Sequence, residues 1–413
     1  MSERAWKTLD VVRRLEAGEV TVGDAAQVLG LSRRQMQRVR QRVADLGHGG
    51  VVHGNVGRVP HNRPDKRVQD RIVKLARTKY RGFNDRQFAE KLVEDEGVPT
   101  SRSAVQRLLR GAGVVPARPR RADKHRKRRD RKTQAGMMIL WDGSKHDWLE
   151  GRGPRMCLMG AIDDATGELL PGAHFVAEEC AAGYLHVLRE IVKAKGIPCS
   201  VYMDKHGSLR RNDGQWTLEE ELRGEQTPTQ VGQALKALEI EAIYAHSPQA
   251  KGRVERPWGT LQDRFVSELR LAKVTTLTGS NALLDWYRPR YNQKFPIPPA
   301  DATPAWRPVR AGVDVDRVCS FQYEAKVHND NAVRLSGHVI DIPPGPGERS
   351  YARARVEVRQ YLDGSWHIYY QDVEIASQSA TVVTELRALG RRKRSAASRA
   401  FRKAVQSISA SLP

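Results

Sequence analysis

Hydrophobic residues recur at helical spacing near the start of the chain. Apolar residues from Val22 to Leu29 lie three and four positions apart, and Gly30 ends the run. Ser32 then precedes a basic stretch, SRRQMQRVRQRVADLG, where its hydroxyl can cap a helix. Small residues, a glycine turn and a capped basic helix are typical of a helix-turn-helix, which we predict for residues 1–46. A plain helical hairpin would show the same pattern.

A second helical unit is predicted over residues 65–115. Helices are expected over 66–78 and 84–93, and a turn at 97–100 leads to a basic helix over 101–110. Between the two units, residues 47–64 are rich in glycine and form an extended linker. The linker is either a flexible tether or a segment that places an arginine in the DNA minor groove.

Strand patterns begin at residue 136. Three strand-like runs occupy the stretch up to Cys180, the second and third too close together for a helix between them, and Asp163 and Asp164 are interpreted as turn residues. Helices and strands then alternate, with a long helix expected over 249–273. The order β-β-β-α-β-α-β-α is that of the ribonuclease-H-like fold, which we predict for residues 136–300.

Short strands return near the C-terminus. Residues 313–377 contain several strand-like runs and a hairpin that turns at Asp363-Gly364, so we predict a small, SH3-like β-barrel there. Residues 378–413 form a basic tail, helical or disordered. The predicted fold class is therefore multidomain α+β: a tandem helix-turn-helix, a ribonuclease-H-like α/β catalytic core and a C-terminal small β-barrel.

The charge of the chain indicates a polyanionic partner. The 413 residues include 70 Lys and Arg against 48 Asp and Glu, a formal net charge of +22. The linker over 116–135 is the densest basic segment, with ten Lys and Arg among residues 116–133. Such a run repels itself until it meets an anion, so we expect it to contact DNA phosphates rather than serve as a solvated tether.

Compartment and membrane signals point to the cytoplasm. No apolar stretch resembles a signal peptide or a membrane span, and we expect no membrane partner. The four cysteines stand far apart without a CxxC pair, which favours ordinary thiols in a reducing compartment over disulfides or a zinc knuckle.

Three acidic residues fall where a metal-dependent phosphoryl-transfer site of this fold would need them. Asp142 lies in the first strand, Asp204 at the carboxyl end of the fourth and Glu255 on the long helix. Carboxylate oxygens are the ligands that Mg²⁺ prefers, and two such ions can activate an attacking oxygen and stabilise a leaving one. Asp147 is either a supporting group behind these acids or a structural residue.

Several segments resemble bacterial insertion-sequence transposases of the DDE class, and the ISNCY-type group in particular. They are WDGSKHDWLEGRG, YMDKHG and HSPQAKGRVERPWGTLQDR, together with the basic run and the paired N-terminal helical units. The resemblance covers nearly the whole chain and implies a retroviral-integrase-like core. It places the metal-binding and catalytic triad on Asp142, Asp204 and Glu255. Two Mg²⁺ ions, for which Mn²⁺ would substitute, are the implied cofactors.

The spacing of the last two acids departs from the retroviral pattern. More residues separate Asp204 from Glu255 than that pattern has, and the polar segment 207–226 accounts for the excess as a loop insertion. Glu239 and Glu241 lie nearer the retroviral spacing, but both flank a strand-like run. Glu255 shares a helix face with Lys251 and Gln262, which can present Lys251 to a DNA phosphate, so we prefer Glu255.

The sequence therefore predicts a DNA transposase that acts in the bacterial cytoplasm, at the nucleoid. It would bind the terminal inverted repeats of a mobile element, free 3′-hydroxyls at the element's ends and join them to target DNA. At least a dimer is expected on double-stranded DNA, because two ends must be joined together. The alternatives are a catalytically silent, sequence-specific DNA-binding regulator and a ribonuclease-H-type nuclease. The expected DNA contacts are Arg33, Arg34, Arg38, Arg58, Arg63, Arg102, Arg107, Arg126, Arg128, Arg129, Lys251, Arg253 and Arg256.

Overall fold

A computed structural model gives the fold of the chain. It describes residues 2–52, 64–115, 129–210, 218–224, 226–245 and 252–386, except for the side chains of residues 219, 223 and 252–255. The chain divides into two compact units, Met1–Val73 and Lys74–Pro413, and each is treated by itself. Most of the predicted linker 47–64, much of the basic linker 116–135 and most of the tail 378–413 lie outside the described residues.

The N-terminal unit is helical, as its hydrophobic pattern predicted. Its elements are α1 (Glu3–Glu16), α2 (Val22–Leu29), α3 (Arg33–Leu46) and the short 3-10 helix η1 (Gly47–Val51). Thr21 and Ser32 cap α2 and α3, each through a capping box that satisfies two free backbone N–H groups. Leu9, Val12 and Met36 meet in one small core. The interpretation of this unit as a helix-turn-helix remains a prediction.

Three further helices cover the region predicted as a second helical unit. They are α4 (Lys66–Arg77), α5 (Asp85–Glu94) and α6 (Arg102–Gly111). The Asn84 side chain caps α5 and the Ser101 hydroxyl caps α6, so polar residues again begin the helices at the predicted positions.

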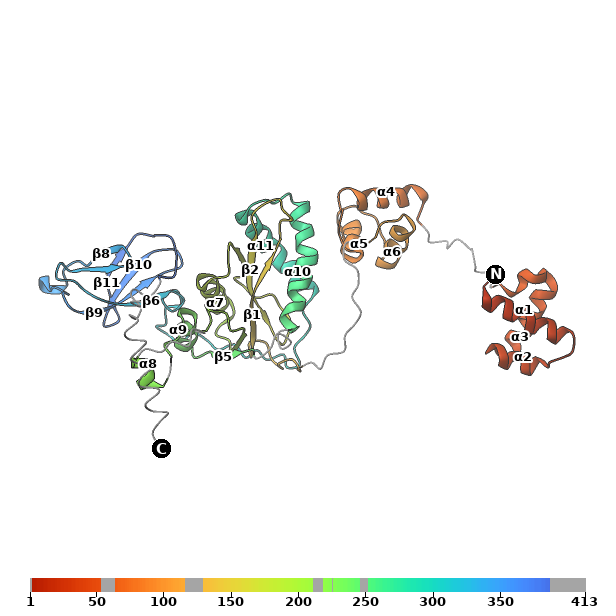
Figure 1. The fold of residues 1–413 in the computed structure, drawn as a ribbon, viewed down its shortest axis with the longest axis horizontal. Helices are drawn as coiled ribbons and strands as arrows, with labels where there is room; N and C mark the ends of the chain where they lie inside the picture. The colour runs from red at the N-terminus through yellow and green to blue at the C-terminus, as the bar shows by residue number, and fades with distance from the viewer. Residues whose placement is uncertain are drawn as a thin grey trace, which may run out of the picture. The chain divides into compact units, whose positions relative to one another are not determined.

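The central region is a five-stranded mixed sheet in the order β3-β2-β1-β4-β5. The first three strands pair antiparallel, and β1, β4 and β5 run parallel. This is the strand order of a ribonuclease-H-like core. Figure 1 shows α7 on one side of the sheet and α10 with α11 on the other. The strands are β1 (Ile139–His146), β2 (Met156–Asp163), β3 (His174–Val176), β4 (Ser200–Met203) and β5 (Glu241–Tyr244); the helices are α7 (Ala181–Lys195), α8 (Leu218–Arg223), α9 (Gln230–Ala237), α10 (Gly252–Leu271) and α11 (Leu277–Lys294).

The alternation of side chains along β1 assigns its two faces to two separate cores. Ile139 and Trp141 belong to the core beneath α7 and α9, whereas Leu140 belongs to the core beneath α10 and α11. Neighbouring β4 follows the same rule, with Met203 on the α7 side and Tyr202 on the α10 side. Every β2 residue is buried, because the strand lies inside the sheet with helices on both faces.

The C-terminal region differs from the predicted closed barrel. Among the described residues its strands form a four-stranded antiparallel sheet, β11-β10-β9-β6, and a separate hairpin, β7-β8. The hairpin turns tightly at Ser336 and Gly337, both with positive φ, and its two short strands form a two-stranded sheet of their own. The elements are α12 (Val315–Val318), β6 (Phe321–Lys326), β7 (Ala332–Leu335), β8 (His338–Asp341), the 3-10 helix η3 (Pro346–Glu348), β9 (Arg355–Gln360), β10 (Trp366–Tyr370) and β11 (Val373–Gln378).

Asp163 and Asp164 hold the turn after β2 and also anchor the end of the basic linker. Asp163 accepts hydrogen bonds from the Gly136 and Thr166 backbone N–H groups at 2.8 and 2.9 Å. Asp164 is completely buried and pairs with Arg129 at 2.7 Å. The interpretation of both residues as turn formers is therefore right but incomplete, because their carboxylates also bind segments that precede β1.

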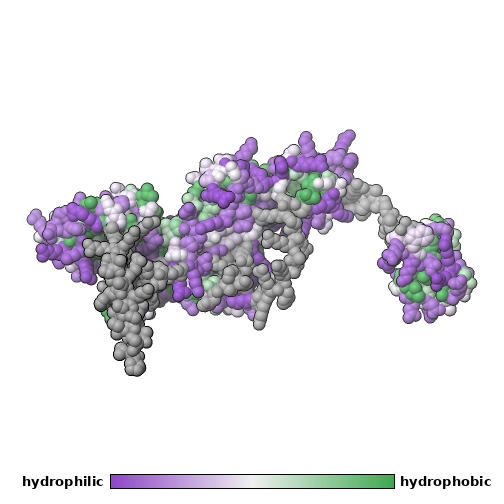
Figure 2. Space-filling view, viewed as in Figure 1, coloured by the Kyte–Doolittle hydropathy of each residue, from purple (hydrophilic) through white to green (hydrophobic). Residues whose placement is uncertain are grey.

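The surface is largely polar on the face shown in Figure 2, where hydrophobic residues form only small patches. Within the described ranges, no helix is both long and apolar enough to cross a bilayer. All four cysteines are unpaired thiols, in agreement with the sequence analysis.

Candidate active site

Asp142 lies in the middle of β1, and Asp204 directly follows β4, the strand that pairs parallel with the start of β1. The register pairs Leu140 of β1 with Tyr202 of β4, and each aspartate stands two residues further along its strand direction. Because side chains alternate along a strand, both carboxylates lie on the face of Leu140 and Tyr202, the face that α10 covers. Neighbouring strands are about 4.8 Å apart, so the fold brings these two half-buried aspartates together.

Helix α10 turns the face that contains Glu255 toward β1. Gln262, seven residues after Glu255 and so on nearly the same helix face, donates to the Ser144 hydroxyl at 3.0 Å. A Cβ built on Gly160, the β-partner of Asp142, would lie 3.0 Å from the ring of Trp258, one helical turn after Glu255. The backbone at Glu255 therefore lies on the side of α10 that covers the two aspartates. Its side chain lies outside the described part of the chain.

Negative charge accumulates around this edge of the sheet. Burial raises the pKa of Tyr184 well above its ordinary value, and the charges of Glu179, Asp142 and Asp204 add to the shift. Burial likewise raises the pKa of the Cys157 thiol to about 12, with Glu179 and Asp142 again contributing. A cluster of carboxylates favours a cation, and its oxygens suit Mg²⁺.

The described side chains alone do not complete a metal site. Among them, no group of three or more His, Cys, Asp and Glu residues could hold a metal ion. Asp142 and Asp204 are two carboxylates of the predicted triad, and the side chain of the third, Glu255, lies outside the described part of the chain. The oxygen donors that are described fit a hard cation.

The alternative acids lie far from this edge. Glu241 pairs with Ser200 in the β5–β4 register, four residues before Asp204, which is about 13 Å along the strand. The Glu239 carboxylate accepts from Arg310 at 2.8 Å. Both acids therefore stand near the amino end of β5, at the opposite end of the strands from the aspartate pair.

Asp147 has a structural role in the turn that follows β1. Its carboxylate accepts from the Gly151 backbone N–H at 3.1 Å, and its carbonyl accepts from the Glu150 N–H at 3.3 Å. Of the two roles left open by the sequence, the structure thus favours the structural one.

The predicted DNA contacts fall into three groups. On α3 and α6 the side chains are exposed, as DNA binding requires, and they belong to Arg33, Arg34, Arg38, Arg102 and Arg107. Arg256 on α10 is also exposed, whereas Arg129 already pairs with Asp164. The other predicted contacts lie outside the described side chains: Arg58, Arg63, Arg126, Arg128, Lys251 and Arg253.

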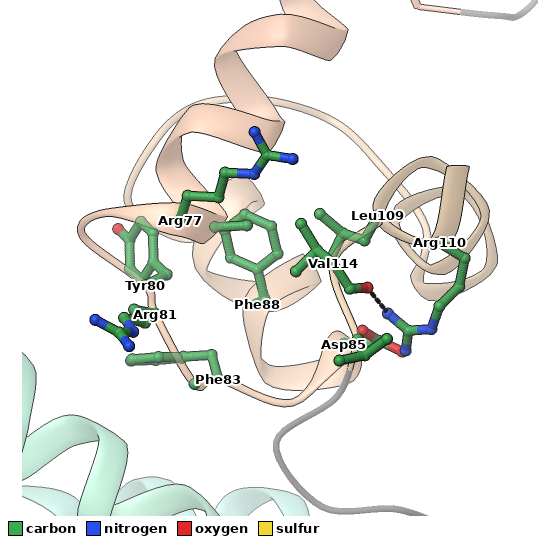
Figure 3. A pocket seen from close by; sticks show the side chains of 12 residues that line it. Arg77, Tyr80, Arg81, Phe83, Asp85, Phe88, Leu109, Arg110 and Val114 are labelled. Carbon is green, nitrogen blue, oxygen red and sulfur yellow. Dashed lines mark hydrogen bonds and ion pairs between the residues drawn. The ribbon is translucent and has the colours of Figure 1, made fainter. Parts of the chain in front are cut away.

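A separate cavity of about 310 Å³ lies in the helical region before the core. Figure 3 shows Phe88, Leu109 and Val114 pointing into it, with Arg77 at its rim and Arg110 donating to the Val114 carbonyl. Its lining contains neither aspartate of the pair and none of the predicted DNA contacts. The cavity is therefore distinct from the candidate active site.

Sequence reasoning missed a polar group that lies behind the two aspartates. Glu179 accepts from the Tyr184 hydroxyl at 2.6 Å, and the His206 backbone N–H donates to Asp204 at 2.9 Å. The only sequence signal was the position of Glu179 between a strand and a helix, which many structural residues share.

The fold and the aspartate pair define a protein with a ribonuclease-H-like strand order and an acidic site on its central strands β1 and β4. Comparison with known sequences gives its family. The "Putative transposase y4bF" of Sinorhizobium fredii is 37% identical over 314 residues, which are 76% of this chain and 67% of that protein. The "Transposase for insertion sequence IS1202" of Streptococcus pneumoniae is 29% identical over 397 residues, 88% of this chain and 76% of that protein. The chain belongs to the bacterial insertion-sequence transposases.

Other comparisons add less. No protein-family model matches the chain. Among solved structures, the HTLV-2 integrase catalytic core domain in complex with magnesium matches 37% of this chain and 86% of its own, at 13% identity and a TM-score of 0.25. A simian T-cell lymphotropic virus intasome in complex with a PP2A regulatory subunit matches 75% of this chain and 99% of its own, at 13% identity and a TM-score of 0.30. These TM-scores are too low to support a fold assignment, which therefore rests on the strand order of the central sheet.

Proposed function

We propose that the protein is a DNA transposase that cleaves at the ends of a mobile element and joins the freed 3′-hydroxyls to target DNA. The observation that carries this proposal is the placement of Asp142 and Asp204 on adjacent parallel strands, beneath the helix face that contains Glu255. Because the chain belongs to a family of transposases, we infer that its substrate is DNA.

The proposed reaction has two steps, and the second leaves the number of phosphodiester bonds unchanged. In the first step a water oxygen attacks the phosphorus at the element's end, and the P–O bond to the 3′-oxygen breaks. In the second step that 3′-hydroxyl attacks a target phosphodiester, so one P–O bond forms as another breaks and no external energy source is needed. When bound, two Mg²⁺ ions would supply charge stabilisation for the attacking and leaving oxygens.

Each residue of the triad has one task in this proposal. The carboxylates of Asp142, Asp204 and Glu255 hold the cations and so position the DNA strand for in-line attack. The exposed arginines of α3 and α6 read and grip the terminal inverted repeats, with residues 1–46 and 65–115 as helix-turn-helix units. The C-terminal sheets hold neighbouring DNA or a second subunit in an assembly that is at least a dimer.

The test uses three substitutions that keep side-chain shape but remove the charge. Asp142→Asn, Asp204→Asn and Glu255→Gln are each expected to abolish end cleavage and strand transfer in Mg²⁺ or Mn²⁺, while binding to end DNA persists. Strand transfer retained by any variant would remove that residue from the site. A wild-type chain that binds the ends but never cuts them would instead indicate the silent regulator.

A further inference from the structure

A fourth acidic side chain, Glu179, lies beside Gly143 on the face of β1 opposite to Asp142. It lies between β3 and α7, and its side chain is 9% exposed. The Tyr184 hydroxyl of α7 donates to its Oε1 at 2.6 Å. The Tyr184 ring in turn packs against Trp141, the residue before Asp142, with ring centroids 5.1 Å apart. Glu179 is therefore clamped in place beside β1.

The residue after Asp142 leaves room for this carboxylate. A Cβ built on Gly143 would lie 2.9 Å from Glu179 Cδ, closer than real Cβ atoms come, and 3.1 Å from Cys157 Sγ, which is a tight contact. Gly143 does not have a positive φ, so its backbone conformation does not require glycine. The absence of a side chain instead leaves space for the neighbouring Glu179. The glycine of the Asp-Gly-Ser motif is thus explained by the approach of Glu179.

Glu179 also reaches the strand end that carries the second aspartate. Its Oε1 lies 3.7 Å from His206 Nδ1, which accepts from the Ser208 backbone N–H at 3.4 Å. His206 in turn donates its backbone N–H to Asp204 at 2.9 Å. On the first strand, Glu179 Oε2 lies 3.9 Å from Lys145 Nζ. One carboxylate thus contacts the segments that follow both aspartates.

We propose that Glu179 is a positioning residue that holds the ends of β1 and β4 together, and so sets the separation of the Asp142 and Asp204 carboxylates. It is not itself a ligand, because Gly143, against which it packs, lies on the face opposite to Asp142. Partners of this kind behind a metal ligand commonly change metal affinity 10- to 100-fold when they are replaced. The inference rests on the function proposed above.

The experiment measures Mn²⁺ binding to the full-length chain by the EPR signal of free Mn²⁺, with Glu178→Gln as matched control. Glu178 is the exposed neighbour of Glu179 and undergoes the same change of charge. Glu179→Gln keeps an acceptor for Tyr184 but loses the charge that faces Lys145. Its dissociation constant for Mn²⁺ is expected to rise about 10-fold or more, with an unchanged melting temperature, whereas the control matches wild type. Glu179→Asp, which restores the charge, is expected to recover part of the affinity.

Three outcomes separate the possibilities. If Asp142→Asn loses Mn²⁺ binding but Glu179→Gln binds like wild type, the positioning role is overturned while the proposed function stands. If wild type and Asp142→Asn bind Mn²⁺ equally and neither cuts DNA, the proposed function itself fails. If Glu179→Gln does not fold, Tyr184→Phe decides, because it removes the 2.6 Å hydrogen bond that fixes the position of the Glu179 carboxylate and is expected to weaken Mn²⁺ binding; unchanged Mn²⁺ affinity in that variant overturns the inference.

Discussion

Replacing Glu90 by glutamine is expected to loosen the contact between α5 and α10. Glu90 Oε2 accepts from Arg264 Nη1 of α10 at 2.8 Å, and its carboxylate also pairs with Lys294 of α11. On the same face of α5, Gln87 donates to Glu268 at 2.9 Å. These contacts join the helical region before the core to the helix that carries Glu255, so they are a route by which the two can influence each other.

The size of the effect follows from burial. The Arg264 side chain is 8% exposed and that of Glu90 is 23% exposed, so solvent screens the pair only in part. Hydrogen bonds to charged groups contribute about 1.5–3 kcal/mol, and glutamine keeps an acceptor but not the charge, so the expected loss is about 2 kcal/mol. A loss of that size makes opening of the contact roughly 30-fold more frequent.

Hydrogen–deuterium exchange measured by mass spectrometry on the full chain tests this expectation. Peptides from α5 and from the Arg264 turn of α10 should exchange faster in Glu90→Gln, while peptides from β1 and β2 keep their wild-type rates. Glu94→Gln, an exposed position on the same helix, is the matched control. Exchange at wild-type rates in α5 of Glu90→Gln would refute the reasoning, and faster exchange throughout the core would show a global rather than a local effect.

The stability of the contact that Glu90 makes with Arg264 and Lys294 should depend on pH. Burial alone would raise the pKa of Glu90, but the hydrogen bonds from Arg264 and Lys294 outweigh it, and the pKa lies below the ordinary value of 4.5. A carboxyl group with a lowered pKa in the folded state stabilises the fold above its unfolded pKa and loses that contribution as pH falls through the folded value. The exchange difference between wild type and Glu90→Gln is therefore expected to be full at neutral pH and to shrink below about pH 4.5.

Two further expectations concern DNA. Replacing the residues of 126–128 by glutamine should lower the log–log salt slope of end-DNA binding by up to about 2.7, at ~0.9 per lost phosphate contact, and a titration at several salt concentrations measures this. Arg129→Gln should leave the slope nearly unchanged, because Arg129 already pairs with Asp164. If the substitutions at 126–128 do not change the slope, the linker is a tether and does not contact DNA phosphates. Replacing Arg34 or Arg38 should cost about 1–3 kcal/mol of preference for element ends over random DNA in footprinting, whereas an unaltered preference would contradict base reading by α3.

Local chemistry was enough to predict most of the elements. Ser32 and Asn84 cap helices where the sequence places them, because an N-cap needs only a side-chain oxygen within three residues of the N–H groups it satisfies. The strand-like run that became β2 was predicted, and the structure shows that this strand is buried on both faces. The order of strands and helices was sufficient to predict the ribonuclease-H-like sheet, and with it the approach of Asp142 to Asp204.

Contacts between distant residues were decided only by the tertiary structure. Glu90 and Arg264 stand 174 positions apart, and no local pattern marks either as the partner of the other. Glu179 has the sequence context of an ordinary loop acid; only the folded sheet brings it over Gly143 and beside His206. The strands of residues 313–377 likewise show their alternation in the sequence. Whether β7 and β8 pair with the larger sheet or with each other depends on a competition for backbone hydrogen bonds that side-chain patterns do not record.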